Sequence, residues 1–361
     1  MAVSSEKELF AKLDEAKRTG QLLQRTATIF EELYFSYKAA VLAAPRAAMD
    51  ELAITRLMAQ LCGLVAAQQR KRHVFGAHHR RVTEPFDYYE MGQRYISALV
   101  DYEISRVGHI ERWRDVQAWI AQGHNVILLA NHQSEADPAV VSLLLESAFP
   151  RLAEDITFVA GDRVVGDPIC IPFSLGRNLF CVHSKKHMDD HPELKSAKTA
   201  SNRKTLLAMQ KALAHGGQLL WVAPSGGRDR STDGPQRYVP DAFDPGVVEL
   251  MATLLRRSKQ PGHLVPMAMF SYTIMPPPPT VERLVGEWRS VARGGVGISA
   301  CAELDLASAE AQRGGSGREQ AARLCEEACH AVRKEFFSLR DAVEGRLAGE
   351  EMERYVQPWK G

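Results

Sequence analysis

A histidine and an aspartate lie five positions apart in residues 131–138, which read NHQSEADP. A neutral imidazole can take a proton from an alcohol when a carboxylate orients its other ring nitrogen. This chemistry makes His132 a candidate general base and Asp137 its partner. A structural interpretation also fits, because Pro138 suits the first position of a helix and makes Asp137 a natural N-cap. One carboxylate can serve both purposes, so the two interpretations are compatible.

A second polar segment, residues 223–230, reads APSGGRDR and follows a short apolar run. Adjacent glycines allow the backbone to approach a ligand closely, and backbone N–H groups near Gly226 are candidates for stabilising an oxyanion. In an extended Arg-x-Arg, both guanidinium groups point to one side and suit a phosphate. Arg228 and Arg230 are therefore candidate phosphate ligands. The alternative is a solvated turn in which the intervening aspartate neutralises a neighbour.

A third polar segment, residues 184–187, reads SKKH and directly follows another apolar run. Three potential cations so close together repel one another unless an anion binds there, although a solvated basic turn is the simpler alternative. Each of the three polar segments ends an apolar run of strand length. Because the carboxyl ends of parallel strands share one edge of a sheet, we expect the three segments to meet there. A base beside such cations suits a phosphorylated alcohol as the nucleophile.

The elements that must position these segments alternate between strand-like and helical patterns after about residue 85. Short apolar runs predict strands, and apolar residues that recur every three or four positions predict helices. Their alternation predicts an α/β fold with a mixed, largely parallel sheet flanked by helices. The expected strands are 125–130, 156–160, 179–183, 218–223, 263–270 and 296–302. The expected helices are 91–107, 110–122, 138–147, 195–215, 245–258 and 318–344.

The first 72 residues show helical patterns only. One helix begins at a capping box in residues 5–8, a second spans about 22–42, and a third starts after Pro45. Short connections between them predict a small antiparallel bundle. A basic stretch near residue 70 then interrupts the apolar pattern. We therefore expect a helical-bundle domain over residues 1–75 and an α/β domain over residues 76–361.

The overall composition argues against several classes of protein. The 361 residues are 45% hydrophobic and 25% charged, as in a soluble globular protein, and the net charge of +1 gives no basic field for nucleic acid. No apolar run reaches the roughly 18 residues that a membrane-spanning helix needs, and the first residues resemble neither a signal nor a transit peptide. The six cysteines form no CxxC pair, which favours buried, reduced thiols. We expect no metal and no cofactor.

The three polar segments, in this order, resemble the motifs of the soluble plastid glycerol-3-phosphate acyltransferase of plants and algae. The likeness covers nearly the whole chain. The HxxxxD pattern alone indicates only the wider glycerolipid acyltransferase superfamily, whereas SKKH and PSGGRDR are more specific. The sequence VPMA at residues 265–268 resembles the family's fourth block. No GxSxG motif is present, so nothing calls for an acyl-enzyme, and Ser134 and Ser225 are weak candidates for a nucleophile.

The resemblance implies a reaction and a role for each segment. A fatty acyl group would pass from acyl–acyl carrier protein, or acyl-CoA, to the sn-1 hydroxyl of glycerol 3-phosphate, giving lysophosphatidic acid in the chloroplast stroma. By this likeness His132 is the general base and Asp137 orients it. The phosphate would be bound by Lys186, His187, Arg228 and Arg230. The site would be supported by Ser225, Gly226, Gly227 and Pro266.

An acidic carrier protein would dock on a basic surface. Two clusters are candidates for that surface, and either is also compatible with a merely solvated run of charges. The first consists of Arg70, Lys71, Arg72, Arg80 and Arg81, and the second of Arg256, Arg257 and Lys259.

Three other functions remain open at this stage. A lysophospholipid acyltransferase of the same superfamily would usually carry a membrane anchor, and none is visible. A non-catalytic module that binds phospholipid or carrier protein would not need the base. A metal hydrolase that uses His132 and Asp137 would need further His or Cys ligands, and the sequence offers no matching set.

Overall fold

The computed structural model describes residues 3–184, 188, 192–231, 238–278, 287–306 and 317–360. Within these ranges, nine strands form one sheet in the order β1-β5-β4-β6-β3-β7-β8-β2-β9. The neighbouring strands from β5 to β7 run parallel, whereas β8 is antiparallel to β7. The prediction of a mixed, largely parallel sheet flanked by helices is therefore confirmed. The strands are β1 (His78–His79), β2 (Arg106–Gly108), β3 (Asn125–Ala130), β4 (Thr157–Gly161), β5 (Asn178–Val182), β6 (Leu219–Val222), β7 (Gly262–Phe270), β8 (Gly297–Ala300) and β9 (Tyr355–Val356).

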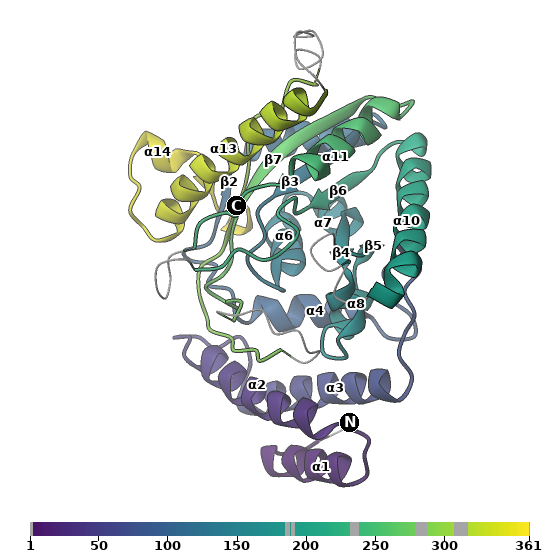
Figure 1. Cartoon of the computed structure of the whole chain (residues 1–361). Helices are drawn as coiled ribbons and strands as arrows, with labels where there is room; N and C mark the ends of the chain where they lie inside the picture. Colours follow the sequence, from purple (N-terminus) through teal and green to yellow (C-terminus); the bar gives the residue numbers. More distant parts are fainter. Residues whose placement is uncertain are drawn as a thin grey trace.

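Helices cover both faces of this sheet (Figure 1). One face packs against α4 (Tyr88–Ser97), α5 (Ile110–Ala121), α6 (Asp137–Leu145) and α7 (Pro150–Asp155). The other face packs against α10 (Lys195–His215), α11 (Pro245–Arg257) and α13 (Gly317–Val343). Shorter elements complete the described chain: α8 (Asp162–Gly166), α9 (Ile171–Leu175), α14 (Glu350–Glu353), η2 (Pro192–Leu194) and η3 (Pro358–Lys360).

The central strand β3 is apolar along nearly its whole length because both of its faces are buried. Val126, Leu128 and Ala130 point into the core beneath α5 and α6, while Ile127 and Leu129 point into the core beneath α11 and α13. Strands β6 and β7 flank β3 on its two sides. The end of β3, where the histidine-containing segment begins, is thus fixed by packing on both faces and by pairing on both edges.

The N-terminal region is helical, as predicted, and lies at the bottom of the view in Figure 1. Its helices are α1 (Glu6–Arg18), α2 (Gln24–Leu42) and α3 (Glu51–Arg70). The third helix begins after Pro45, as predicted, and Asp50 caps it by accepting a hydrogen bond from Ala53 N at 2.7 Å. The Tyr37 hydroxyl donates to the Tyr95 carbonyl at 2.9 Å, and their rings stack. The bundle therefore packs directly onto α4, and a domain boundary near residue 75 stays a prediction.

The helix predicted over residues 91–107 is wrong in its second half. The helix α4 ends at Ser97, and Arg106–Gly108 forms β2 instead. This strand pairs in parallel with β8 and antiparallel with β9. The buried Leu99, Val100 and Val107 fit a helical pattern equally well. Pairing with strands that lie about 190 and 250 residues later overrides that local pattern. The sequence near residue 106 does not indicate this pairing.

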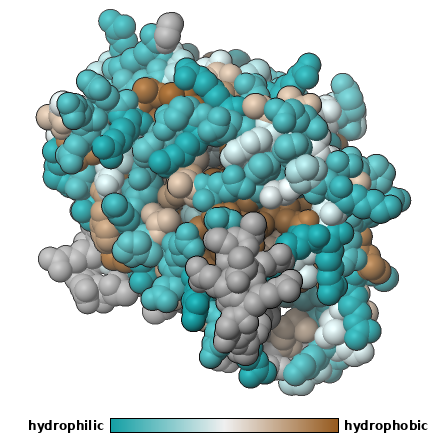
Figure 2. Space-filling view, turned by 90° about the horizontal axis from the view of Figure 1, so that it is seen from above, coloured by the Kyte–Doolittle hydropathy of each residue, from teal (hydrophilic) through white to brown (hydrophobic). Residues whose placement is uncertain are grey.

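The surface is largely hydrophilic on the face seen from above, and hydrophobic residues gather near the middle of that face (Figure 2). No helix among the described residues is both long enough and apolar enough to cross a bilayer.

Candidate active site

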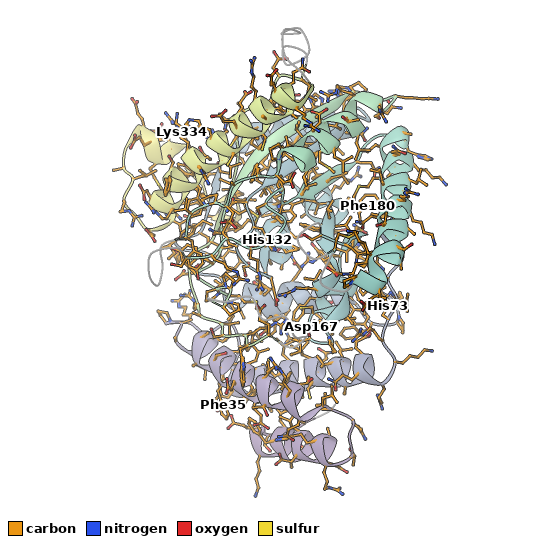
Figure 3. All side chains as sticks on the ribbon, in the orientation of Figure 1. Phe35, His73, His132, Asp167, Phe180 and Lys334 are labelled. Atoms are coloured by element: carbon orange, nitrogen blue, oxygen red, sulfur yellow. The ribbon has the colours of Figure 1, made fainter. Side chains whose placement is uncertain are left out.

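His132 and Asp137 form a hydrogen-bonded pair at the end of β3, near the centre of the view in Figure 3. The distance from His132 Nδ1 to Asp137 Oδ2 is 2.7 Å. Because an ionised carboxylate only accepts hydrogen bonds, Nδ1 carries the hydrogen and the neutral ring keeps its lone pair on Nε2. No described residue bonds to Nε2, and the imidazole is 23% exposed. The pair can therefore accept a proton from an incoming hydroxyl group.

Asp137 is fully buried, and both of its carboxylate oxygens are bound. Oδ2 also accepts from Gln133 N at 2.8 Å, and Oδ1 accepts from the Ser271 hydroxyl at 2.5 Å. The expectation that Asp137 is the N-cap of the following helix is wrong. Asp137 is the first residue of α6, the cap position falls on Ala136, and the carboxylate turns back toward the loop before it. Its oxygens are thus used entirely to fix the imidazole and its loop.

Asn131 joins the histidine loop to the neighbouring strand. Its side-chain amide both donates to and accepts from the backbone of Met269, at 3.0 and 2.8 Å, as the next residue of a strand would do. The same Nδ2 donates to Asp229 Oδ2 at 3.0 Å. One step further, Asp229 N donates to the His132 carbonyl at 2.5 Å. The segments 131–138 and 223–230 therefore meet at one edge of the sheet, as their positions after parallel strands predict.

The Asp229 side chain points inward to Asn131 and not toward the arginines on either side of it. It is fully buried and also accepts from Asp241 N at 3.0 Å. Burial raises the pKa of this carboxyl from 3.8 to about 7, because the hydrogen bonds it accepts offset only part of the cost of desolvating its charge. The alternative in which this aspartate neutralises Arg228 or Arg230 is not what the structure shows.

The glycine turn between β6 and the arginines has a left-handed residue at Gly226, with φ of +68°. Any side chain at this position would be strained. The Gly226 N–H donates to the Ala223 carbonyl at 3.0 Å, so this group is not free to stabilise an oxyanion. The Ser225 hydroxyl donates to the Gly227 carbonyl at 2.9 Å and not to a base. Ser225 and the two glycines thus shape the turn.

Arg228 lies among carboxylates and forms an ion pair with Glu287. Its Nη1 is 3.6 Å from Glu135 Oε1, and Glu135 is in the histidine loop. Arg289 binds the same Glu135 at 2.7 Å and Asp167 at 2.9 Å. Burial would raise the pKa of Glu135, but the charges of Arg289 and Arg228 outweigh it and hold that pKa at about 2. A buried network of alternating charges therefore lies beside the base.

Arg230 has a different environment from Arg228. Its guanidinium donates to the Pro278 carbonyl, and no described carboxylate is paired with it. Burial lowers its pKa, and the positive charges of Arg228 and Arg163 lower it further. Like charges gathered in this way would be stabilised by an anion.

The other predicted site residues either lie outside the described part of the chain or form no described hydrogen bond with the base. Lys186 and His187 lie outside the described residues, and Ser184, which precedes them, has its hydroxyl 3.5 Å from where a Cβ on Gly226 would stand. Pro266 is buried in β7, in register with Leu129 of β3. It therefore supports the sheet behind the histidine loop and does not contact the base through any described hydrogen bond.

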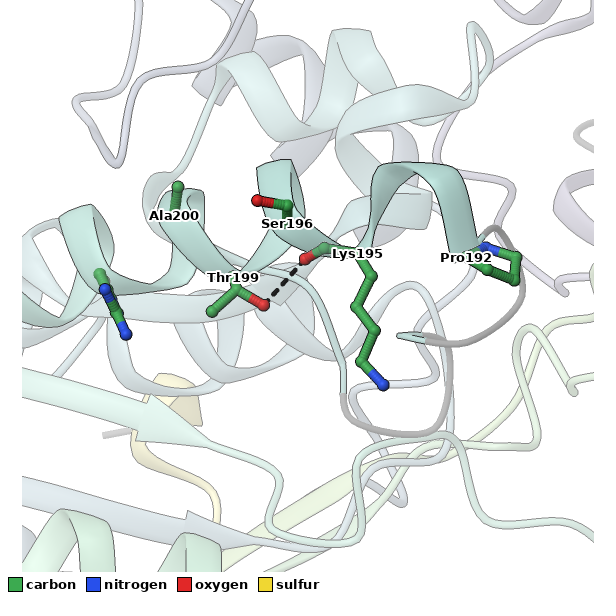
Figure 4. A pocket seen from close by; sticks show the side chains of 6 residues that line it. Pro192, Lys195, Ser196, Thr199 and Ala200 are labelled. Atoms are coloured by element: carbon green, nitrogen blue, oxygen red, sulfur yellow. Dashed lines mark hydrogen bonds between the residues drawn. The ribbon is translucent and has the colours of Figure 1, made fainter.

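The ring of Trp221 in β6 lies edge-on to the His132 ring, with centroids 5.5 Å apart. An apolar wall of this kind keeps water away from one side of the imidazole. Two surface cavities lie elsewhere: one of about 530 Å³ on the first turns of α10 (Figure 4) and one of about 370 Å³ between α11 and α13. No described group of three or more His, Cys, Asp or Glu residues is arranged to hold a metal ion.

In each of the two candidate docking clusters, one cation already forms an ion pair within the protein. Arg81 pairs with Glu154 at 2.8 Å, and Arg256 pairs with Glu249. The other members are exposed, and they are Arg70, Lys71, Arg72, Arg80, Arg257 and Lys259.

Sequence reasoning missed Ser271, Glu287, Arg289 and Asp167. Ser271 directly follows β7, so the rule that polar residues after strands line one edge would have found it. Glu135 lies within the quoted motif, but its type alone does not reveal an arginine partner. The others, Glu287, Arg289 and Asp167, lie outside helices and strands, where no sequence pattern predicts their contacts.

Comparison with known proteins identifies the family of this chain. Residues 110–270 match the family model described as Acyltransferase. A chloroplastic glycerol-3-phosphate acyltransferase of Cucurbita moschata is 44% identical over 304 residues, which are 84% of this chain and 66% of that protein. The chloroplastic enzyme of Arabidopsis thaliana is 40% identical over 358 residues, covering 98% of this chain and 78% of that one. The one of Pisum sativum is 39% identical over 360 residues, covering 99% and 78%.

This chain thus spans just under two thirds of the Cucurbita protein and more than three quarters of the other two. The resemblance inferred from the three polar segments is confirmed by these matches, which extend through the N-terminal helices as well as the sheet. The chain belongs to the glycerol-3-phosphate acyltransferase family.

Proposed function

We propose that this protein transfers a fatty acyl group from acyl–acyl carrier protein, or acyl-CoA, to the sn-1 hydroxyl of glycerol 3-phosphate, giving lysophosphatidic acid. One observation carries the proposal: a histidine whose Nε2 has no partner among the described residues is tied by its own carbonyl to the loop that holds two partly buried arginines. A base and an anion-binding group that share one hydrogen-bonded edge suit an alcohol that also carries a phosphate. Family membership supplies the class of reaction.

In the proposed mechanism, His132 Nε2 takes the proton as the substrate oxygen attacks the thioester carbonyl carbon. The new C–O bond forms, a tetrahedral oxyanion follows, and its collapse breaks the C–S bond. The imidazolium then returns the proton to the departing thiolate. Asp137 holds the ring in the productive tautomer and stabilises its positive charge. A positioned base of this kind accelerates a reaction about 10²–10⁴-fold.

The phosphate would be bound by Arg228 and Arg230, with Lys186 and His187 from the preceding segment. Bidentate contacts from guanidinium groups would fix the three-carbon chain so that its far hydroxyl reaches His132. Arg230 is the more readily available of the two arginines, because no described carboxylate competes for it. Arg228 would have to share its charge between the phosphate and the carboxylates that it already contacts.

The setting of the reaction is part of the proposal. The relatives named above are chloroplastic, and we propose the chloroplast stroma for this chain. We propose that residues 1–75 form a helical domain and residues 76–361 the catalytic domain. The exposed cations at the end of α3, Lys71 and Arg72, are proposed to meet the acidic carrier protein.

The purified protein should acylate glycerol 3-phosphate with acyl–acyl carrier protein and should leave its 1-acyl derivative unchanged. His132→Ala should reduce turnover about 10²–10⁴-fold while glycerol 3-phosphate still binds. Acylation of the 1-acyl derivative alone would indicate a lysophospholipid acyltransferase. Full turnover by His132→Ala, or no turnover by the wild type with any acyl donor, would reject the proposed base or the proposed function, respectively. Abolition of activity by a chelator would indicate a metal hydrolase.

A further inference from the structure

Glu287 is a buried carboxylate with one oxygen in use and one without a partner. The residue is only 5% exposed. Its Oε2 pairs with Arg228, whereas Oε1 is buried and has no hydrogen-bond partner among the described residues. A buried acceptor left unsatisfied costs free energy, and a charged one costs more than a neutral one. An unsatisfied buried carboxylate oxygen beside a functional arginine is therefore a candidate for binding a donor on the substrate.

Two contacts hold Glu287 next to the reacting end of the site. Its carbonyl accepts from Arg289 Nη1 at 2.9 Å, and Arg289 binds Glu135 of the histidine loop. Its side chain binds Arg228, whose neighbour Asp229 donates to the His132 carbonyl. Glu287 is thus held by contacts that lead both to the histidine loop and to the arginine loop.

We propose that Glu287 Oε1 accepts a hydrogen bond from the hydroxyl group on the middle carbon of glycerol 3-phosphate. This inference rests on the proposed function. A three-carbon polyol phosphate carries its phosphate at one end and its reacting hydroxyl at the other, and the hydroxyl between them is a donor. An ionised carboxylate can only accept hydrogen bonds, so Glu287 suits a donor on the substrate. The pairing would satisfy Oε1 and would orient the carbon chain between Arg228 and His132.

The charge of Glu287 makes it a specificity determinant as well as a contact. Arg228 lies against this carboxylate and would also face the phosphate, so its positive charge offsets the repulsion between the two anionic groups. A substrate with no hydroxyl on its middle carbon would leave the carboxylate unsatisfied. A substrate with a carbonyl there would place two acceptors face to face. Sites built to bond a hydroxyl reject analogues that lack it, because the buried group is then unpaired.

The test compares glycerol 3-phosphate with 3-hydroxypropyl phosphate, which lacks only the middle hydroxyl. The wild type should prefer glycerol 3-phosphate in kcat/KM by about 10- to 100-fold, as expected for a hydrogen bond to a charged group. Glu287→Ala should reduce this preference to within a few-fold, mainly by losing activity toward glycerol 3-phosphate. A preference that is unchanged in Glu287→Ala overturns the inference.

A matched control is Asp167→Asn, which also alters a buried carboxylate of the same network but pairs with Arg289 and not with Arg228. It should change overall activity without changing the preference between the two phosphates. If Glu287→Ala turns over too slowly, dissociation constants of both phosphates measured in His132→Ala, with and without Glu287→Ala, give the same comparison. Failure of the proposed function would be distinct, since the wild type would then acylate neither phosphate.

Discussion

The two sides of the active site are held together in different ways. On the base side, both oxygens of Asp137 accept hydrogen bonds from neutral donors, which are the imidazole, Gln133 N and the Ser271 hydroxyl. On the anion side, Arg228 and Arg289 are held by carboxylates, and one oxygen of Glu287 has no partner within the described part of the chain. The first arrangement is complete without substrate, whereas the second contains a cation that can also pair with an incoming anion.

This difference indicates where the substrate changes the protein. A base whose orientation is fixed beforehand needs no reorganisation during proton transfer. A cation that is already paired keeps its charge stabilised while the site is empty, and it can share that charge with a phosphate when the substrate binds. Substitutions on the base side should therefore alter turnover, and those on the anion side should alter binding and stability.

The largest effect is expected from Asp137→Asn. The amide keeps one acceptor oxygen but replaces the other oxygen by an NH2 donor and removes the negative charge, which weakens the partner that orients the imidazole and stabilises the imidazolium. We expect kcat to fall about 10²–10⁴-fold with little change in KM for glycerol 3-phosphate. Steady-state kinetics check this, with Ser271→Ala as the milder control because it leaves the His132–Asp137 bond intact. A normal kcat would show that the base side does not act as a unit.

Arg228→Ala and Arg230→Ala should separate binding from stability. Each should raise KM for glycerol 3-phosphate about 10- to 100-fold through loss of a charged hydrogen bond. Arg228→Ala should also lower Tm clearly, because it leaves Glu287 buried without its ion-pair partner, whereas Arg230→Ala should lower Tm less. Kinetics and thermal melting of the two variants make the comparison. Normal saturation in both would reject the phosphate assignment.

Asp229 joins the two sides, and its raised pKa predicts a pH-dependent stability. Between the ordinary pKa of 3.8 and the folded pKa of about 7, the folded protein keeps a proton that the unfolded chain releases. Stability contributed by Asp229 is therefore lost as pH rises through that window and levels off above about pH 7. The free energy of unfolding of the wild type, minus that of Asp229→Asn, should fall by about 2 kcal/mol from pH 5 to pH 7. Urea denaturation at several pH values measures this difference, and a constant value contradicts it.

The smallest effect is expected far from both sides. Replacing Lys71 and Arg72 together by alanine should reduce the rate with acyl–acyl carrier protein a few-fold at low salt, and less at high salt, because exposed charges act mainly on association. The rate with acyl-CoA should not change. Arg257 and Lys259 offer a control pair of equally exposed cations. If only the control pair matters, the carrier docks there, and if neither matters, both docking surfaces are wrong.

Much of the fold could be predicted from local pattern because the central strands are buried on both faces. The run from Asn125 to Ala130 has the composition that such a strand requires, and its bounds match the prediction. The short strands β1, β2 and β9 could not be predicted, because two or three residues carry no periodicity. Their pairing depends on distant strands.

The candidate site also has a part that could be predicted from the sequence and a part that could not. The positions of His132, Asp137 and the two arginines after buried strands predicted that they would meet at one edge, since that follows from topology alone. The carboxylates around Arg228 could not be predicted, because Glu287 reaches it from a loop 59 residues away. The direction of the Asp229 side chain could not be predicted either, because it depends on a hydrogen bond from Asn131, 98 residues earlier.

The amide of Asn131 continues the ladder of β7 for one step after β3 has ended. The backbone hydrogen of Met269 should consequently exchange with solvent only when the centre of the sheet opens. The histidine loop would then have no melting transition of its own. On heating, this protein should stay active until its secondary structure is lost, with both signals disappearing at one temperature.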